Sequence, residues 1–272
     1  MHCPVSRCQR VLHRTAGTRP ALPAPHQCRS SERTPPGYRV SGSGCRTCPA
    51  WKVDGSSTWA IHIHGLGGTR AGTLRGVQVT TEHGCTSLAV SYRNDGEGPT
   101  VGTGRSTLGW AEADDIEAAI HYALQRGTER VMLFGCSMGG AIAIRLAMRP
   151  HLAPFMAGLV LDSPVLDWRS VIRSNCTRAG LPACAGDLAT PWLNRGHLAR
   201  VLGLPGPISL HAMSYTSWAP QLAMPTLILQ GTTDDSVPDK TSLALAARRP
   251  GLVQVHQFSA DNTLSWNSDS VS

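Results

Sequence analysis

The stretch "VMLFGCSMGGAIAIRLAM", residues 131–148, predicts a buried strand, a sharp turn at a serine and a buried helix. The turn is "GCSMG" (135–139), a G-x-S-x-G pattern. A serine on such a turn has a strained backbone, and Gly135 and Gly139 would let the strand and the helix approach closely. We therefore expect Ser137 to be a nucleophile whose hydroxyl lies at the positive end of the helix dipole.

Short apolar runs alternate with helical stretches from Trp51 onward, which predicts an α/β fold: a mostly parallel central sheet flanked by helices. The expected strands are 58–65, 86–92, 130–135, 157–162, 225–231 and 252–258, and the expected helices are 111–127, 140–148 and 240–250. Residues 163–222 break this rhythm and are predicted to be a helical lid insertion. The lid would divide the core into two parts, residues 50–162 and 223–272.

Residues 1–49 are predicted to be a poorly ordered basic extension. The first 50 residues contain eight arginines and one acid, which accounts for the whole formal charge of +7, so the remaining chain is neutral. Their Arg-rich composition is typical of transit peptides, and a mis-assigned start site would explain it equally well.

The neutral body gives no reason to expect a nucleic-acid partner. No run of 18 apolar residues occurs, so we expect no membrane partner.

Nine cysteines, an odd number spread over a long chain, favour a reducing compartment, and we expect a cytoplasmic protein with free thiols. Cys45 and Cys48 form a C-x-x-C, but no second matched pair or histidine pair completes a zinc site. We therefore expect no bound metal.

The segment "HGLGG" (64–68) follows the first expected core strand. Its glycines would allow a backbone N–H to point into a site, and we expect the amides of Leu66 and Met138 to form an oxyanion hole. His64 and Gly65 would support this loop, with His64 structural rather than catalytic. Arg70 and Arg75, which follow the loop, are expected to be solvated rather than to bind a carboxylate.

The segment "GTTDDSVP" (231–238) places an acid after a late strand, at the sheet edge where open parallel sheets build their sites. Asp234 is preferred to Asp235 as the acid of a Ser-Asp-His triad, because it comes first after the turn in the spacing G-x-x-D-x-x-V-P. Asp162, at the end of "LVLD", is the reserve candidate.

These three motifs, together with "SYRNDGEGP" (91–99), "LDSPVLDW" (161–168) and "NTLSWN" (262–267), resemble the α/β-hydrolase superfamily. The resemblance is to its single-domain bacterial serine hydrolases, related to the prolyl-oligopeptidase and serine-aminopeptidase branches, and covers about residues 50–267. It implies a Ser-Asp-His hydrolase of esters, thioesters or amides that acts on a small-molecule acyl substrate and needs neither metal nor cofactor.

The family's catalytic histidine corresponds to Asn262 in "SADNTLSWN". An amide nitrogen has no basic lone pair, so Asn262 cannot accept the serine proton, and we expect a crippled enzyme. The nearest substitute is His256, six residues earlier in the last expected strand, roughly 20 Å away along an extended chain.

The family's closing helix is also missing, which predicts a truncated C-terminus and uncovered sheet surface that an oligomer could cover. Two other interpretations stay open. The chain could be a non-catalytic binding or scaffold protein that keeps the hydrolase pocket. Alternatively, Asn262 could be a sequencing, engineering or pseudogene change in an otherwise active enzyme.

Overall fold

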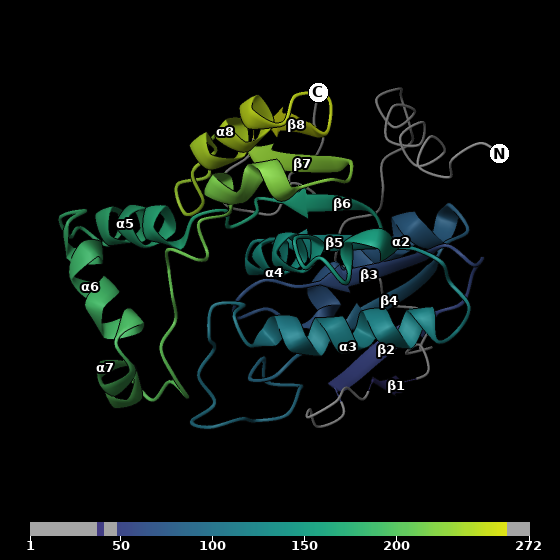
Figure 1. The fold of residues 1–272 in the computed structure, drawn as a ribbon, viewed down its shortest axis with the longest axis horizontal. Coiled ribbons are helices and arrows are strands. Elements are labelled where there is room, and N and C mark those ends of the chain that lie inside the picture. Colours follow the sequence, from purple (N-terminus) through teal and green to yellow (C-terminus); the bar gives the residue numbers. More distant parts are fainter. Residues whose placement is uncertain (1–36, 41–47, 260–272) are drawn as a thin grey trace.

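The computed structural model describes residues 37–40 and 48–259 of the 272-residue chain. They form one sheet with the strand order β1-β2-β4-β3-β5-β6-β7-β8 (Figure 1). The strands are β1 (Gly37–Val40), β2 (Cys48–Val53), β3 (Trp59–Ile63), β4 (Thr86–Val90), β5 (Val131–Cys136), β6 (Met156–Asp162), β7 (Thr226–Gly231) and β8 (Val253–Phe258). All neighbours from β4 to β8 are parallel, whereas β2 is antiparallel to both β1 and β4. The predicted α/β fold with a mostly parallel central sheet is confirmed.

All six strands predicted from apolar runs are present. Strands β3 and β4 are buried at every position, as strands covered on both faces must be. Strands β1 and β2 were not predicted, because "GYRV" is too short to give a periodic signal and "CPAWKV" has a proline as its second residue. The sheet therefore begins at Gly37, inside the segment 1–49 that the composition assigned to an extension.

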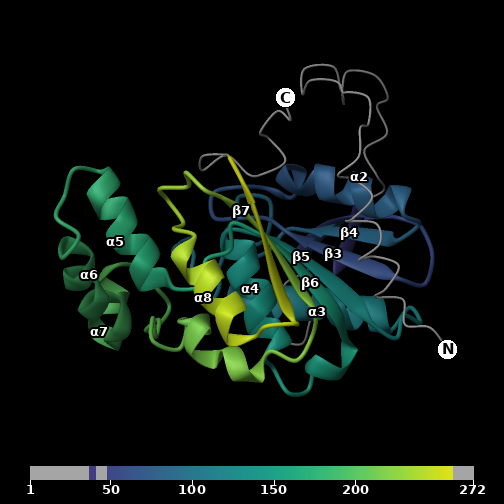
Figure 2. The same ribbon diagram turned by 90° about the horizontal axis from the view of Figure 1, so that it is seen from above.

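The α-helices are α2 (Leu74–Glu82), α3 (Glu112–Leu124), α4 (Met138–Ala147), α5 (Trp168–Arg178), α6 (Ala185–Asn194), α7 (Gly196–Val201) and α8 (Lys240–Arg248), and the short 3₁₀ helices are η2 (Arg70–Thr73), η3 (Ala153–Phe155) and η4 (Tyr215–Gln221). Helix α2 lies on the face of the sheet opposite α3, α4 and α8 (Figure 2). The three predicted helices are confirmed. In the part of the chain that the structure describes, no helix is both long enough and apolar enough to cross a membrane.

Helix α4 is the most deeply buried helix of the core. Every residue from Met138 to Ala147 is buried except Arg145, because the helix packs on β5, β6 and α3. It begins two residues before the predicted start at Gly140, directly after Ser137. The position of that serine is therefore fixed by two of the best-packed elements of the molecule, β5 and α4.

Residues 163–222 form helices α5, α6, α7 and η4 after β6, and Figures 1 and 2 place α5 to α7 beyond one end of the sheet. Asp167 caps α5 by accepting a hydrogen bond from the Arg169 amide at 3.1 Å. Asp187 of α6 pairs with Arg169 and Arg173 of α5 at 3.3 and 2.9 Å. These contacts hold α5 and α6 together as a helical group.

Candidate active site

Ser137 occupies the turn between β5 and α4 with φ 49° and ψ −115°, a backbone conformation that residues with side chains rarely adopt. Its N–H donates to the Asp162 carbonyl at 2.8 Å, and its carbonyl accepts from the Val165 and Gly140 amides at 3.1 and 3.0 Å. The end of β6 and the first turn of α4 therefore hold the strained residue from two sides.

Gly135 and Gly139 are required because the backbones of β3, β5 and α4 approach each other closely here. A Cβ on Gly135 would lie 2.4 Å from the Gly139 carbonyl oxygen, and a Cβ on Gly139 would lie 2.2 Å from the Ile63 carbonyl oxygen. Real Cβ atoms do not come so close to backbone oxygens. The G-x-S-x-G spacing thus allows α4 to pack directly against the end of β3, from which the loop 64–68 departs.

A cavity of about 230 Å³ lies beside Ser137. It is lined by His64, Gly65, Leu66, Gly68, Thr69, Gly72, Cys136 and Ser137. A Cβ on Gly65 would lie 3.2 Å from the Ser137 Cβ, which shows how closely the loop passes the serine. The structure therefore brings the predicted nucleophile and the predicted oxyanion loop to one cavity.

The two amides predicted as oxyanion donors belong to two segments, the loop after β3 and the first turn of α4. Leu66 lies on the wall of the cavity with 53% of its surface exposed, whereas Met138 is 1% exposed and opens α4. The first N–H groups of a helix have no acceptor within the helix, so the Met138 amide is available to a ligand at this helix end.

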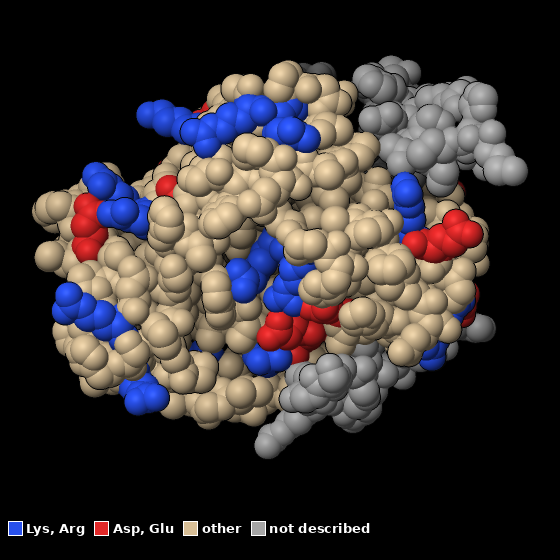
Figure 3. All heavy atoms as spheres, in the orientation of Figure 1, with Lys and Arg blue, Asp and Glu red and all other residues tan. Residues whose placement is uncertain are grey.

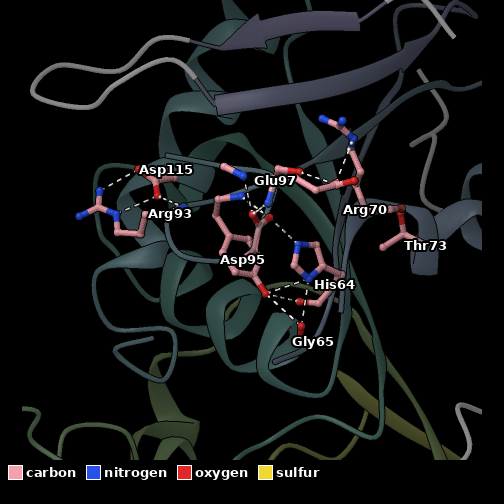
Figure 4. A network of polar contacts seen from close by, with 11 residues as sticks. His64, Gly65, Arg70, Thr73, Arg93, Asp95, Glu97 and Asp115 are labelled. Carbon is pink, nitrogen blue, oxygen red and sulfur yellow. Dashed lines mark hydrogen bonds and ion pairs between the residues drawn. The ribbon is translucent and has the colours of Figure 1, made fainter. Parts of the chain in front are cut away.

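His64 is buried, and both of its ring nitrogens lie within hydrogen-bond distance of fixed partners (Figure 4). Nε2 lies 3.0 Å from Asp95 Oδ2, and Nδ1 lies 2.9 Å from the Gly65 carbonyl oxygen and 3.0 Å from the Tyr92 hydroxyl. The Tyr92 ring stacks on the imidazole with centroids 4.2 Å apart. This arrangement holds the first residues of the loop 64–68 against the turn that follows β4, and it engages both ring nitrogens of His64.

Asp95 is the anchor of this arrangement. Its carboxylate also accepts hydrogen bonds from the backbone amides of Tyr92, Glu97 and Gly98 at 2.9, 2.9 and 2.6 Å. Burial opposes ionisation, but the hydrogen bonds from His64 and from these amides outweigh it and lower the pKa of Asp95 to about 2. Sequence reasoning did not assign Tyr92 or Asp95 a role, although the stretch 91–99 carried part of the family resemblance.

The expectation of a solvated Arg70 is wrong. Its side chain is 15% exposed, its guanidinium lies over the Trp51 ring at 4.6 Å, and its Nε lies 3.4 Å from Glu97 Oε2 (Figure 4). The turn after β4 therefore touches the segment 64–73 twice, through Asp95 and through Glu97. Arg75 is exposed on α2, as expected.

Asp234 lies three residues after β7 and is 8% exposed. Its Oδ1 accepts hydrogen bonds from the Ser236 and Val237 amides at 3.0 and 2.8 Å. The same loop is tied to α5, because Ser174 Oγ donates to the Asp235 carbonyl at 2.7 Å. The Asp235 side chain is 63% exposed and lies 3.7 Å from Arg178. Of the two neighbouring acids, Asp234 is therefore the one held in a fixed, shielded position.

The reserve candidate, Asp162, is fully buried at the end of β6. It lies opposite Cys136 of β5, which lines the cavity, and its charge affects the pKa of the Cys136 thiol. Burial raises the pKa of the Cys136 thiol well above its usual range, and the negative charge of Asp162 raises it further. Cys136 therefore stays a protonated thiol and does not compete with Ser137 as a nucleophile.

Asn262, the position predicted for the missing base, lies outside the described residues, as does Cys45 of the C-x-x-C pair. His256 is exposed on β8, opposite Leu229 of β7. His62 of β3 is buried, its Nε2 lies 3.2 Å from the Thr80 hydroxyl, and burial lowers its pKa to about 3. Within residues 37–40 and 48–259, no group of three or more His, Cys, Asp or Glu side chains could hold a metal ion.

The structure thus places a strained serine at a strand-to-helix turn beside a glycine-rich loop. These are the two motifs, 135–139 and 64–68, that carried part of the family resemblance. Residues 60–262 match the family model described as "Alpha/beta hydrolase family". The chain belongs to the alpha/beta hydrolase family. By family it is therefore a hydrolytic enzyme, and the match ends at Asn262, the position predicted for the missing base.

Solved structures with the alpha/beta hydrolase fold resemble this chain over most of its length. The Pyrococcus furiosus esterase Pf2001 is 18% identical, with a TM-score of 0.62 and 83% of each chain covered. The Paleococcus ferrophilus monoacylglycerol lipase is 20% identical, with a TM-score of 0.56, 81% of this chain and 93% of that chain covered. Mouse alpha/beta hydrolase domain-containing protein 10 is 14% identical, with a TM-score of 0.58, 83% of this chain and 90% of that chain covered. A search of curated proteins found no match.

We predict that Gly139→Ala destabilises the protein by about 3 kcal/mol or more, because the new methyl group would overlap the Ile63 carbonyl and force β3 and α4 apart. Denaturant unfolding measures this change. Gly72→Ala is the matched control, since a Cβ there meets no atom within 4 Å, and it should change stability by less than about 1 kcal/mol. Equal effects of the two substitutions on stability would contradict the conclusion that Gly139 is required by the close approach of β3 and α4.

We predict that Asp95→Asn destabilises the protein by about 2 kcal/mol at pH 7, because the carboxylate has a folded-state pKa of about 2 against an ordinary value of 3.8. A lowered pKa stabilises the fold above pH 3.8, and this contribution disappears as the pH falls through about 2. Unfolding curves of both proteins between pH 7 and pH 2 should therefore converge at the acid end. A stability difference independent of pH would exclude the ionised carboxylate as its source.

Proposed function

We propose that this protein is a serine hydrolase of ester, thioester or amide bonds, working through an acyl-enzyme on Ser137, and that Asn262 leaves it with little turnover. In this proposal the Ser137 Oγ attacks the acyl carbon, the oxyanion is held by the Leu66 and Met138 amides, and Asp234 orients the residue at position 262. His64, Gly65, Gly135 and Gly139 shape the site without touching the reacting atoms.

The observation that carries the proposal is the backbone of Ser137. Its φ of 49° is a conformation whose cost, about 1–3 kcal/mol, persists only where surrounding structure enforces it. An ordinary turn between a strand and a helix would place a glycine at such a position. Here the strained residue carries a hydroxyl and lines a cavity, which supports selection for an exposed nucleophile.

The carboxylate of Asp234 supports the same proposal through its geometry. Its two hydrogen bonds from backbone amides both reach Oδ1, so that Oδ2 is the oxygen that would face the residue at position 262. In a complete triad that residue is a histidine, which takes the serine proton and returns it to the leaving group. Asparagine fits the same space and can donate to a carboxylate, but it cannot take the proton.

Small molecules are the partners that the surface favours. Charged side chains on the face drawn in Figure 3 are scattered in small groups of both signs, separated by wide uncharged areas. A continuous basic surface, as nucleic-acid binding requires, is absent from that face of the described residues. We also propose a cytoplasmic protein, since Cys136, Cys176 and Cys184 carry free thiols. The motif resemblance supports a bacterial protein related to the prolyl-oligopeptidase and serine-aminopeptidase branches.

The alternative function is a binding or scaffold protein that keeps the pocket and has no turnover. The loss of the base at Asn262 is the observation that favours it. Against it stand the strained serine, the loop 64–68 and the shielded Asp234, because loss of selection for catalysis would be expected to erode more than one of them. Residues 163–222 would form a lid in either case, covering a substrate or a bound ligand.

Restoring the base tests the proposal. We predict that Asn262→His raises the rate of p-nitrophenyl acetate hydrolysis at least about 10³-fold, because a general base contributes that much or more to a serine triad. The double variant Asn262→His with Ser137→Ala is the matched control and should return the rate to the background. A folded Asn262→His variant that gains no activity would refute the assignment of position 262. Substantial activity of the unchanged chain would point to another base, with His256→Ala as the follow-up.

A further inference from the structure

We propose that this protein docks on an anionic lipid surface through the outward side of helices α6 and α7. The contact surface, called the α6–α7 surface below, consists of Leu188, Trp192, Arg195, Arg200 and Val201. These residues line no part of the cavity beside the serine, so the proposal is independent of the proposed function. The expectation of no membrane partner was based on the lack of a spanning segment, which has no bearing on contact with a membrane surface.

The outward side of α6 is apolar. Gly186 is buried, and a Cβ there would lie 3.1 Å from the Ile172 side chain, so this residue marks the side of α6 that packs on α5. Leu188, Pro191 and Trp192 lie on the opposite side of the helix and are exposed. Leu188 has 74% of its surface exposed, and Trp192 has 43%. Surface helices normally have the reverse arrangement, with the polar side facing the solvent.

Helix α7 contacts α6 and extends this apolar surface. Val201 is the last residue of α7 and has 74% of its surface exposed, and Leu202, which follows it, is also exposed. Figures 1 and 2 both place α6 and α7 at one extreme of the longest axis of the molecule. The α6–α7 surface therefore projects from the molecule and can reach a flat partner without interference from the sheet.

The charge at the α6–α7 surface is basic. Arg195 and Arg200 are exposed, and no aspartate or glutamate occurs in residues 188–233. Asp187, the nearest acid in the sequence, is paired with two arginines of α5. At this end of the molecule Figure 3 shows basic side chains set in a largely uncharged surface. Apolar side chains accompanied by arginines are typical of helices that bind anionic membranes.

Charge also decides between a lipid surface and a second copy of the chain. Two copies that met through this surface would bring Arg195 and Arg200 of one close to the same arginines of the other, and like charges repel. An anionic membrane offers phosphates to both arginines and an apolar interior to Leu188 and Val201. Trp192 suits the boundary between these regions, where tryptophan rings are enriched.

Sedimentation with lipid vesicles tests the proposal on the full chain. The vesicles contain either phosphatidylcholine alone or phosphatidylcholine mixed with phosphatidylglycerol, which is anionic. We expect the protein to bind the anionic vesicles at least about tenfold more tightly than the neutral ones, and this binding should weaken as salt is added.

Substitutions then assign the binding to the α6–α7 surface. The double variant Leu188→Gln with Val201→Gln should weaken binding to anionic vesicles about tenfold or more, because it removes two apolar side chains from the contact. Arg195→Gln should weaken it about fivefold. The matched control is Val79→Gln with Leu243→Gln, which changes two exposed apolar residues on α2 and α8 and should leave binding unchanged.

Unchanged binding in the double variant would overturn the proposal, because the contact would then belong to other residues, such as the arginines of residues 1–49. Failure to bind the anionic vesicles would also overturn it and would leave an acidic protein as the partner. A dimer that dissociates in the double variant would assign the surface to a second copy instead. Unfolding curves check that the variants fold, and Arg195→Gln remains as the test if the double variant does not.

Discussion

The structure depends on the close approach of three backbones: the end of β3, the end of β5 and the first turn of α4. The Ile63 carbonyl, the Gly135 backbone and the Gly139 backbone meet at distances that leave no room for a Cβ at either glycine. This contact forces the chain through a sharp turn at Ser137, and it fixes where the loop after β3 departs. A single packing constraint in the core thus places Ser137 and the start of the loop 64–68.

A second layer of contacts holds the loop once the core has placed it. Asp95 and Glu97 lie in one turn after β4, and they reach His64 and Arg70 at the two ends of the segment 64–73. The contact between His64 and Asp95 is the stronger of the two, because the Asp95 carboxylate is fully hydrogen-bonded and shielded from water. The contact between Arg70 and Glu97 is partly exposed. In the proposed function this turn would orient the loop that carries the Leu66 amide, because oxyanion donors stabilise a transition state best when they are already oriented.

The sequence predicted the parts of the fold that have a strong local signal. Apolar runs identified six of the strands, β3 to β8. The pattern G-x-S-x-G identified the sharp turn at Ser137, because packing requires its glycines. Helix α2 was missed, since "LRGVQVTTE" contains a glycine and several β-branched residues, which are weak helix formers, and tertiary packing supplies its stability. The roles of Tyr92 and Asp95, and the burial of Arg70 over Trp51, were missed because they arise from contacts between segments about 20–30 residues apart, which no local pattern encodes.

In the proposed function, Ser137, the loop 64–68 and Asp234 are three parts of a proton-transfer site, and the fourth part would be the amide of Asn262. A crystal structure of the full chain tests this account most directly, because it locates that residue relative to the elbow. The account predicts the Asn262 side chain within hydrogen-bond distance of both Asp234 Oδ2 and Ser137 Oγ, with Ser137 at positive φ. A Ser137 hydroxyl packed into the core, or Asn262 on the opposite side of the sheet, would contradict it.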